Sequence, residues 1–240
     1  MRPASPRFIA CGEPPTAGGI VVYGIPFEGR VNLRKGAQAG PRDLRLASDS
    51  IETYSAVLGR DLEDLPLFDL GDCELPADAA PRVQLDAHPD TREEFLGERY
   101  NYASAMARVM DVVPADRVYQ VGMRTGSREE FERRRPKFFP AMAGHPLDVV
   151  RRLLPELQGC PLYVTIDVDV LDPAHAPGTG SPEPGGLSVP ELIEIVRLLG
   201  AATVIGGDLV EVAHAWDPTA RTGIAASWVI REALLTWWGK

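Results

Sequence analysis

Short apolar runs that end at Gly, Asp or Pro alternate along this chain with longer stretches of helical periodicity. Runs of this length, bounded by turn residues, are typical of buried strands. We expect strands at residues 20–25, 67–70, 83–85, 118–121, 162–166 and 203–205. We expect helices at residues 41–50, 103–113, 146–157, 190–199 and 220–238. This alternation predicts an α/β fold with a mostly parallel sheet that helices cover on both faces.

Length and composition favour one domain over residues 1–240, with residues 1–19, rich in Pro and Gly, as an irregular lead-in. The net charge of −9 argues against a surface for nucleic acid or anionic membrane, which needs clustered Lys and Arg. Cys11, Cys73 and Cys160 are far apart and form no CxxC pair, which fits a reducing cytoplasm. No apolar run approaches the ~18 residues of a membrane span.

Two acidic segments directly follow apolar runs. The first, Asp86-Ala87-His88-Pro89-Asp90, places Asp86, His88 and Asp90 at alternate positions, which in an extended chain lie on one side. The second segment does the same with Asp167 and Asp169. In open parallel sheets, polar residues just beyond the carboxyl ends of strands form the binding site. These five side chains are therefore the candidate site.

A divalent metal ion explains these residue types better than turn capping does. Burying ionised carboxylates costs several kcal/mol each unless they are paired. Four carboxylates that converge at strand ends would repel one another without a cation. Oxygen ligands with one imidazole suit Mn²⁺ or a similar metal better than structural zinc. A single Asp-x-Asp segment is as easily a turn cap, but two such segments favour the metal. His145 and His175, in Pro-containing loops, are expected to face solvent.

Both acidic segments resemble the metal signatures of the ureohydrolases, the arginase and agmatinase family. The resemblance covers nearly the whole chain and is closest to the bacterial agmatinases. The further similar segments are Gly24-Ile25-Pro26-Phe27-Glu28-Gly29, Gly40-Pro41-Arg42, Val121-Gly122-Met123-Arg124, Asp172-Pro173-Ala174-His175-Ala176-Pro177-Gly178-Thr179-Gly180, Gly185-Gly186-Leu187 and Asp208-Leu209-Val210-Glu211-Val212.

The resemblance implies a three-layer αβα fold and a two-manganese hydrolase that cleaves a linear guanidine to urea and an amine. It implies that Asp86 and Asp167 bridge both metal ions. By position, His88 and Asp169 complete one metal site, while Asp90 binds the other ion and orients the attacking hydroxide. Glu211 would hold the guanidinium group by charge-assisted hydrogen bonds.

Agmatine, cleaved to putrescine and urea, is the preferred substrate, because the agmatinase-like segments are the closer ones. Guanidinobutyrate is the alternative substrate. A catalytically silent homologue that acts through association with active subunits is the alternative role. A homo-oligomer in the cytoplasm, with a small-molecule substrate and no nucleic-acid or membrane partner, completes the expectation.

The chain departs from the family pattern in three places. Family members carry a Gly-Gly-Asp/Glu-His segment on its own helix–strand unit before the Asp-Ala-His signature. Here Asp72 is followed too soon by Asp86 for such a unit. The missing histidine is the only imidazole on the metal site that Asp90 completes, so that site is expected to be weakened. Tyr102 stands where a proton-transferring histidine is usual, and His214 where proline is usual.

The missing strand belongs inside the sheet of the family. Without it, the strands on either side lose backbone hydrogen bonds, at about 1–3 kcal/mol for each buried group left without a partner. We therefore expect that the flanking strands re-pair, that water or another chain enters, or that the fold is weakened.

Overall fold

Parallel strands dominate the computed structural model, which describes residues 6–13, 18–26, 34–72, 82–133, 137–140 and 144–239. Phe27 to Gly29 of the N-terminal motif and Cys73 lie outside these ranges. The elements are β1 (Ile20–Gly24), α1 (Gly40–Ser48), β2 (Tyr54–Ser55), β3 (Arg60–Asp61), β4 (Leu67–Asp72), β5 (Arg82–Leu85), α2 (Ala105–Met110), β6 (Val118–Val121), α3 (Arg128–Arg133), β7 (Lys137–Phe139), α4 (Pro146–Leu157), β8 (Pro161–Asp167), α5 (Val189–Leu199), β9 (Thr203–Val210) and α6 (Arg221–Trp237).

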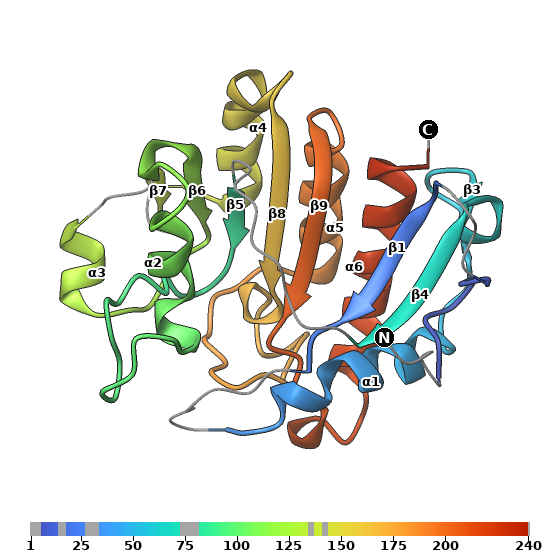
Figure 1. Ribbon diagram of the computed structural model, residues 1–240, viewed down its shortest axis with the longest axis horizontal. Coiled ribbons are helices and arrows are strands. Elements are labelled where there is room, and N and C mark those ends of the chain that lie inside the picture. The colour runs from blue at the N-terminus through green and yellow to red at the C-terminus, as the bar shows by residue number, and fades with distance from the viewer. Residues whose placement is uncertain are drawn as a thin grey trace.

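The main sheet has five parallel strands in the order β7-β6-β5-β8-β9 (Figure 1). Strands β1 and β4 form a separate parallel pair, and β2 and β3 a small antiparallel one. All six predicted strands and all five predicted helices are present, with ends that differ by a few residues. The sequence analysis missed β7 and the β2–β3 pair, because two or three residues are too few to show a period.

Helices cover both faces of the main sheet. Side chains alternate between the faces along a strand, so neighbours in sequence report on opposite layers. Tyr119 and Val121 of β6 belong to the large core that contains residues of α4, α5 and α6. Val118 precedes Tyr119, so its side chain points to the opposite face, where it packs with Met106 of α2. The three-layer αβα arrangement expected from the sequence is confirmed.

Residues that favour the start of a helix stand at the N-termini of α1, α4 and α5. Helix α5 begins with a capping box, in which the Ser188 side chain accepts the N–H of Glu191 and the Glu191 carboxylate accepts the N–H of Ser188. Prolines stand in the first turns of α1, α4 and α5, where a missing N–H costs nothing. None of the described helices is long and apolar enough to cross a membrane.

Strands β5 and β8 lie side by side in the middle of the sheet and end together. Their register pairs Leu85 with Ile166. The next residue on each strand is therefore an aspartate, Asp86 on one and Asp167 on the other. Parallel pairing thus brings the two acidic segments to one edge of the sheet.

The parallel strands of the described residues fall into two separate groups, the five-stranded sheet that ends at β9 and the β1–β4 pair. Strand β9 pairs only with β8, and β1 only with β4, so no ladder joins β1 to β9 within the described residues. Figure 1 shows β1 and β4 lying beyond β9. Strands β9 and β1 each carry an exposed apolar side chain: Ile205 of β9 is 55% exposed and Val21 of β1 is 48% exposed. Among the residues that the structure describes, β1 and β9 are therefore not paired with each other, and the outer edge of β9 has no strand partner.

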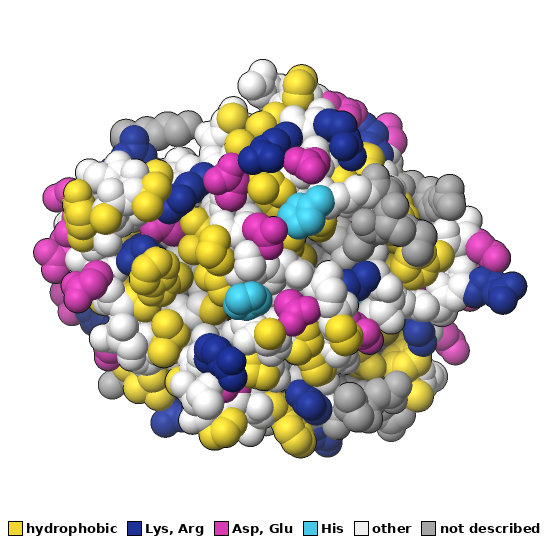
Figure 2. All heavy atoms as spheres, turned by 180° about the vertical axis from the view of Figure 1, so that it is seen from behind, with side chains coloured by type: hydrophobic (Ala, Val, Ile, Leu, Met, Phe, Trp, Pro, Cys, Tyr) yellow, Lys and Arg dark blue, Asp and Glu magenta, His cyan; other side chains and the backbone are white. Residues whose placement is uncertain are grey.

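The face of the molecule opposite to that view carries mixed charge. Figure 2 shows Lys and Arg side chains there scattered among acidic and apolar ones, with no broad basic patch among the described residues. This distribution agrees with the negative net charge of the chain.

Hydrogen–deuterium exchange followed residue by residue tests the open edge. Successive amides of a parallel strand point to its two neighbours in turn. Residues 163–166 of β8 have a partner strand on both sides and should exchange slowly throughout. Strand β9 should instead show slow and fast amides in alternation, because those that face away from β8 have no strand partner. Continuous protection along β9 would mean that another strand pairs with this edge.

Candidate metal and substrate site

The segment that follows β5 turns back on itself. Asp86 is 2% exposed, and its Oδ1 accepts the backbone N–H of His88 at 2.6 Å. Asp90 adopts the left-handed conformation, with φ of 53°. The prediction that Asp86, His88 and Asp90 lie on one side of an extended strand was therefore wrong, since the chain bends at Ala87 and His88.

The segment that follows β8 is tied to the first one. The Asp167 side chain accepts the N–H of Asp169 at 2.8 Å and so caps the short helical turn Val168–Val170. Asp169, which is 3% exposed, uses Oδ1 to accept the N–H of Ala87 at 3.0 Å. This hydrogen bond fixes the Asp169 carboxylate against the β5 segment.

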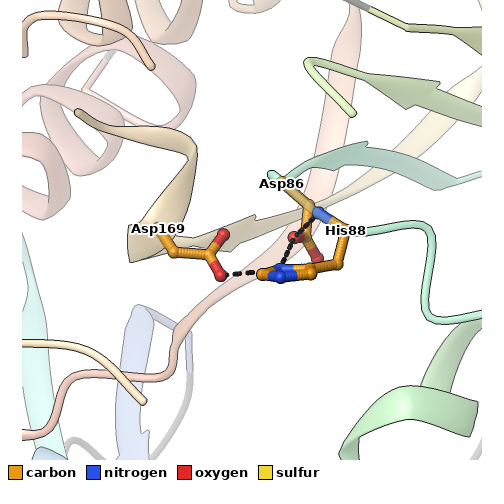
Figure 3. A group of neighbouring side chains, drawn as sticks. All are labelled: Asp86, His88 and Asp169. Carbon is orange, nitrogen blue, oxygen red and sulfur yellow. Dashed lines mark hydrogen bonds and ion pairs between the residues drawn. The ribbon is translucent and has the colours of Figure 1, made fainter. Parts of the chain in front are cut away.

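Asp86, His88 and Asp169 form a compact group at this junction (Figure 3). The Nδ1 of His88 lies 2.9 Å from Oδ2 of Asp169 and 3.6 Å from Oδ1 of Asp86. One ligand-type atom from each of the three residues lies within 4.8 Å of the others. This spacing lets all three side chains contact one cation.

Asp90 and Asp167 lie close enough to this group to feel its charge. Burial, and then the Asp86 carboxylate, raise the pKa of Asp90 well above its ordinary value. Burial and then Asp169 do the same to the pKa of Asp167. The four aspartates Asp86, Asp90, Asp167 and Asp169 are therefore close enough for their negative charges to affect one another.

His88 is the one cationic partner within the group. Burial disfavours its charged form, but hydrogen bonds to Asp169 and Asp86 outweigh burial and raise the pKa of His88 to about 11. The same contact with His88 outweighs burial at Asp169 and lowers its pKa. Burial and the charge of Asp169 raise the pKa of Asp86 to about 7. One imidazolium thus leaves most of the repulsion uncompensated.

A divalent cation fits this donor set. Carboxylate oxygens with one imidazole nitrogen are ligands for Mn²⁺ and related ions. Such an ion lowers the pKa of each neighbouring carboxyl, which removes the repulsion that Asp86, Asp90 and Asp167 otherwise experience. Binding would also displace the proton that His88 now shares with Asp169.

Glu211 adjoins the group from the end of β9. It directly follows Val210 and has φ of 64°, a conformation that strains a residue with a side chain. Its charge contributes to the raised pKa of both Asp90 and Asp167. A Cβ atom at Gly180 would stand 3.3 Å from its Oε2. The Glu211 carboxylate therefore lies against the backbone at Gly180, near enough to Asp90 and Asp167 for its charge to raise their pKa.

Among the described residues, the other histidines are not part of the group formed by Asp86, His88 and Asp169. His145 is exposed, with Nε2 3.2 Å from Oε1 of Glu191, as expected for a surface residue. His175 is half-buried and lines an open pocket of about 220 Å³ with Arg221 and Trp228. His214 begins a short helical turn beyond Glu211.

Tyr102 occupies the position where the resemblance expects histidine. It is half-buried, and its ring contacts Phe95 edge-on with 5.8 Å between centroids. A phenol with an ordinary pKa of about 10 exchanges protons poorly near neutral pH.

The sequence analysis missed the polar residues that support the site. Gln84 and Gln120 stand inside apolar strand runs, an anomaly that marks buried polar groups. Arg124 donates from Nη2 to the carbonyl oxygens of Asp169 at 2.6 Å and Glu183 at 2.7 Å. The Arg124 guanidinium thereby holds the segment that carries Asp169.

Comparison with known proteins places these features in a family. A sequence model described as the Arginase family matches residues 18–83 and 77–236. The agmatinase of Bacillus anthracis is 34% identical over 265 residues, covering 91% of this chain and 91% of the relative. The guanidinobutyrase of Pseudomonas aeruginosa is 27% identical, covering 88% of this chain and 84% of the relative. The structure of proclavaminate amidino hydrolase from Streptomyces clavuligerus matches with a TM-score of 0.83 and 26% identity, covering 97% of this chain and 96% of its own.

The alignments also indicate that this chain lacks a segment that a relative has. The alignment with the B. anthracis agmatinase spans 265 positions, more than the 240 residues of this chain. That relative therefore has residues without a counterpart here, and the family match breaks into two parts around residues 77–83. The break lies just before the Asp86 segment, where the sequence analysis located the missing unit. The match on both sides of it identifies the chain as a member of the arginase family of hydrolases.

Proposed function

We propose that this protein hydrolyses a linear guanidine, with agmatine as the substrate and putrescine and urea as the products. The observation that carries the proposal is the buried carboxylate group at the ends of β5 and β8, with Glu211 beside it. The 34% identity to an agmatinase over nine-tenths of the chain supports agmatine among the guanidines. Water adds its oxygen to the guanidinium carbon, and the amine leaves with a proton.

Glu211 binds the substrate end of the site in this proposal. A guanidinium group carries its charge on a planar fork of N–H donors, which a carboxylate accepts in pairs. Glu211 faces the acidic group from the neighbouring strand, so a guanidinium held there lies against Asp90 and Asp167. Asp90 orients the attacking water by accepting a hydrogen bond from it.

Asp86, His88, Asp90, Asp167 and Asp169 are the residues proposed to hold two Mn²⁺ ions. When bound, the ions supply a Lewis acid that makes water a stronger nucleophile at neutral pH. Asp86 and Asp167 are each assigned to both ions, and His88 and Asp169 to one of them. The ion on the Asp90 side has carboxylates alone, because the segment that provides its histidine in relatives is missing here. That ion is proposed to bind more weakly.

Two alternatives have their own support. Guanidinobutyrate is the second candidate substrate, because a guanidinobutyrase is 27% identical to this chain. A catalytically silent homologue that assembles with active subunits is the second candidate role. It is favoured by Tyr102 and by the missing unit, since both remove an imidazole from the site.

Urea release from a panel of guanidines separates these functions. At saturating Mn²⁺, agmatine should release urea, while guanidinobutyrate and arginine should release at least tenfold less. Release from guanidinobutyrate alone would replace the substrate and keep the chemistry. Silence over the whole panel, in a preparation that binds Mn²⁺, would contradict the proposed activity.

Asp167→Asn tests the metal assignment. Asparagine keeps an oxygen that accepts the N–H of Asp169, so the turn remains capped while the charge is lost. Mn²⁺ binding should weaken by more than the roughly 10–100-fold that loss of an outer-shell partner costs. Metal analysis and titration calorimetry measure the effect. Asp116→Asn, at an exposed carboxylate before β6, is the control for loss of a negative charge and should bind Mn²⁺ as the unchanged chain does. Undiminished Mn²⁺ content in Asp167→Asn would refute the assignment.

Glu211→Gln tests the substrate contact separately from the metal. The amide is isosteric but neutral and loses the charge-assisted hydrogen bonds, each of which contributes about 1.5–3 kcal/mol. The kcat/KM for agmatine should therefore fall at least tenfold, while the Mn²⁺ content stays near that of the unchanged chain. Loss of Mn²⁺ instead would make Glu211 a metal ligand and not a substrate contact.

A further inference from the structure

Two buried glutamines stand side by side on adjacent strands beneath the acidic segment. Gln84 of β5 is 3% exposed, Gln120 of β6 is fully buried, and the two are direct partners in the parallel register. Alternation along the strands turns both away from the large core, on which Val83 and Tyr119 pack. Burying an amide is unfavourable unless its groups find partners, so packing alone does not explain them.

The two side chains form one connected set of hydrogen bonds. The Nε2 of Gln84 donates to Oδ2 of Asp86 at 2.6 Å and to the carbonyl oxygen of His88 at 3.4 Å. The Nε2 of Gln120 donates to Oε1 of Gln84 at 2.5 Å and to the carbonyl oxygen of Pro89 at 2.5 Å. Both N–H groups of each amide are therefore used.

The acceptors at the ends fix the direction of this set. A backbone carbonyl oxygen can only accept, so Gln84 must turn its NH₂ toward His88 and Asp86 and its oxygen toward Gln120. Gln120 must then turn its own NH₂ toward Gln84 and Pro89. Its Oε1 is left buried without a hydrogen-bond partner among the described residues. In this arrangement the two glutamines donate three hydrogen bonds to the acidic segment and share one with each other.

These contacts complete the anchoring of the acidic segment. Four successive carbonyl oxygens of the segment each accept a hydrogen bond. Those of His88 and Pro89 accept from the two glutamines. That of Ala87 accepts from the N–H groups of Arg124 and Thr125, and that of Asp90 from those of Met106 and Ala107. The glutamines hold the middle of the segment, where no backbone N–H of the described residues donates to the carbonyl oxygens of His88 and Pro89.

We propose that Gln84 and Gln120 are positioning residues for the metal site. Gln84 orients the Asp86 carboxylate directly, and Gln120 fixes the Gln84 amide and the backbone between His88 and Asp90. The inference rests on the proposed metal-dependent function, because its subject is the arrangement of the ligands. Outer-shell hydrogen bonds of this kind typically change metal affinity by roughly 10–100-fold.

The test replaces both amides at once. In Gln84→Leu/Gln120→Leu, the hydrogen bond between the two amides disappears from both sides, while Asp86 and the carbonyl oxygens of His88 and Pro89 lose their donors, so the Tm of the metal-free protein should fall. At a temperature where circular dichroism shows the variant to be folded, the Kd for Mn²⁺ from titration calorimetry should rise roughly 10–100-fold. Gln158→Leu, at an exposed position beyond α4, is the control and should leave the Kd unchanged. Gln84→Asn keeps an amide but is one methylene too short to reach Asp86, and it should also weaken Mn²⁺ binding.

The outcomes separate this inference from the function beneath it. If the unchanged chain binds no Mn²⁺, the proposed function fails and the positioning role fails with it. If the unchanged chain binds Mn²⁺ and the variants match it within twofold, only the positioning role is overturned. Where the variants do not fold, NMR of the unchanged chain decides. The side-chain NH₂ protons of Gln84 and Gln120 should exchange slowly with solvent, and rapid exchange would overturn the inference.

Discussion

Repulsion between buried carboxylates at the ends of two neighbouring strands is the constraint on which this site depends. Asp86 directly follows β5 and Asp167 is the last residue of β8, so the parallel register of Leu85 with Ile166 places the two side by side. Asp169 and Asp90 add two further carboxylates from the segments that follow. Within the group His88 is the cationic side chain, the Arg124 guanidinium interacts with Asp169 and Asp86 from outside it, and burial together with mutual repulsion still raises the pKa of Asp86, Asp90 and Asp167. An arrangement that is unfavourable without a cation is favourable with one, which makes these strand ends a binding site.

The surrounding structure keeps the carboxylates together despite that repulsion. Backbone N–H groups, the two buried glutamines and the Arg124 guanidinium all hold the two acidic segments in place. The donors come from β5, β6, the turns beyond them and the first turn of α2. The open edge of β9 lies on the other side of β8, so the interruption of the sheet spares these anchors. It does adjoin Glu211, which follows the last residue of β9.

Much of this could be predicted from the sequence, and the failures have physical reasons. Periodicity and turn residues located the major elements, and the two acidic segments located the site, because strand ends in a parallel sheet meet at one edge. The turn at Asp86–Asp90 escaped prediction, since Asp90 adopts a left-handed conformation that its sequence does not announce. Gln84 and Gln120 also escaped, because their role depends on pairing between strands that lie 36 residues apart. The missing helix–strand unit was expected only through the family resemblance, and the sequence did not predict that the unpaired edge would lie at β9, because this depends on how the remaining elements pack.

Anomalous X-ray scattering at the manganese edge, from crystals grown with Mn²⁺, tests the central claim most directly. The account predicts a strong peak among Asp86, His88, Asp167 and Asp169, with the imidazole of His88 released from Asp169. It predicts a weaker second peak on the Asp90 side, where imidazole is lacking. Crystals that show no peak at these strand ends, with His88 still hydrogen-bonded to Asp169, would contradict it.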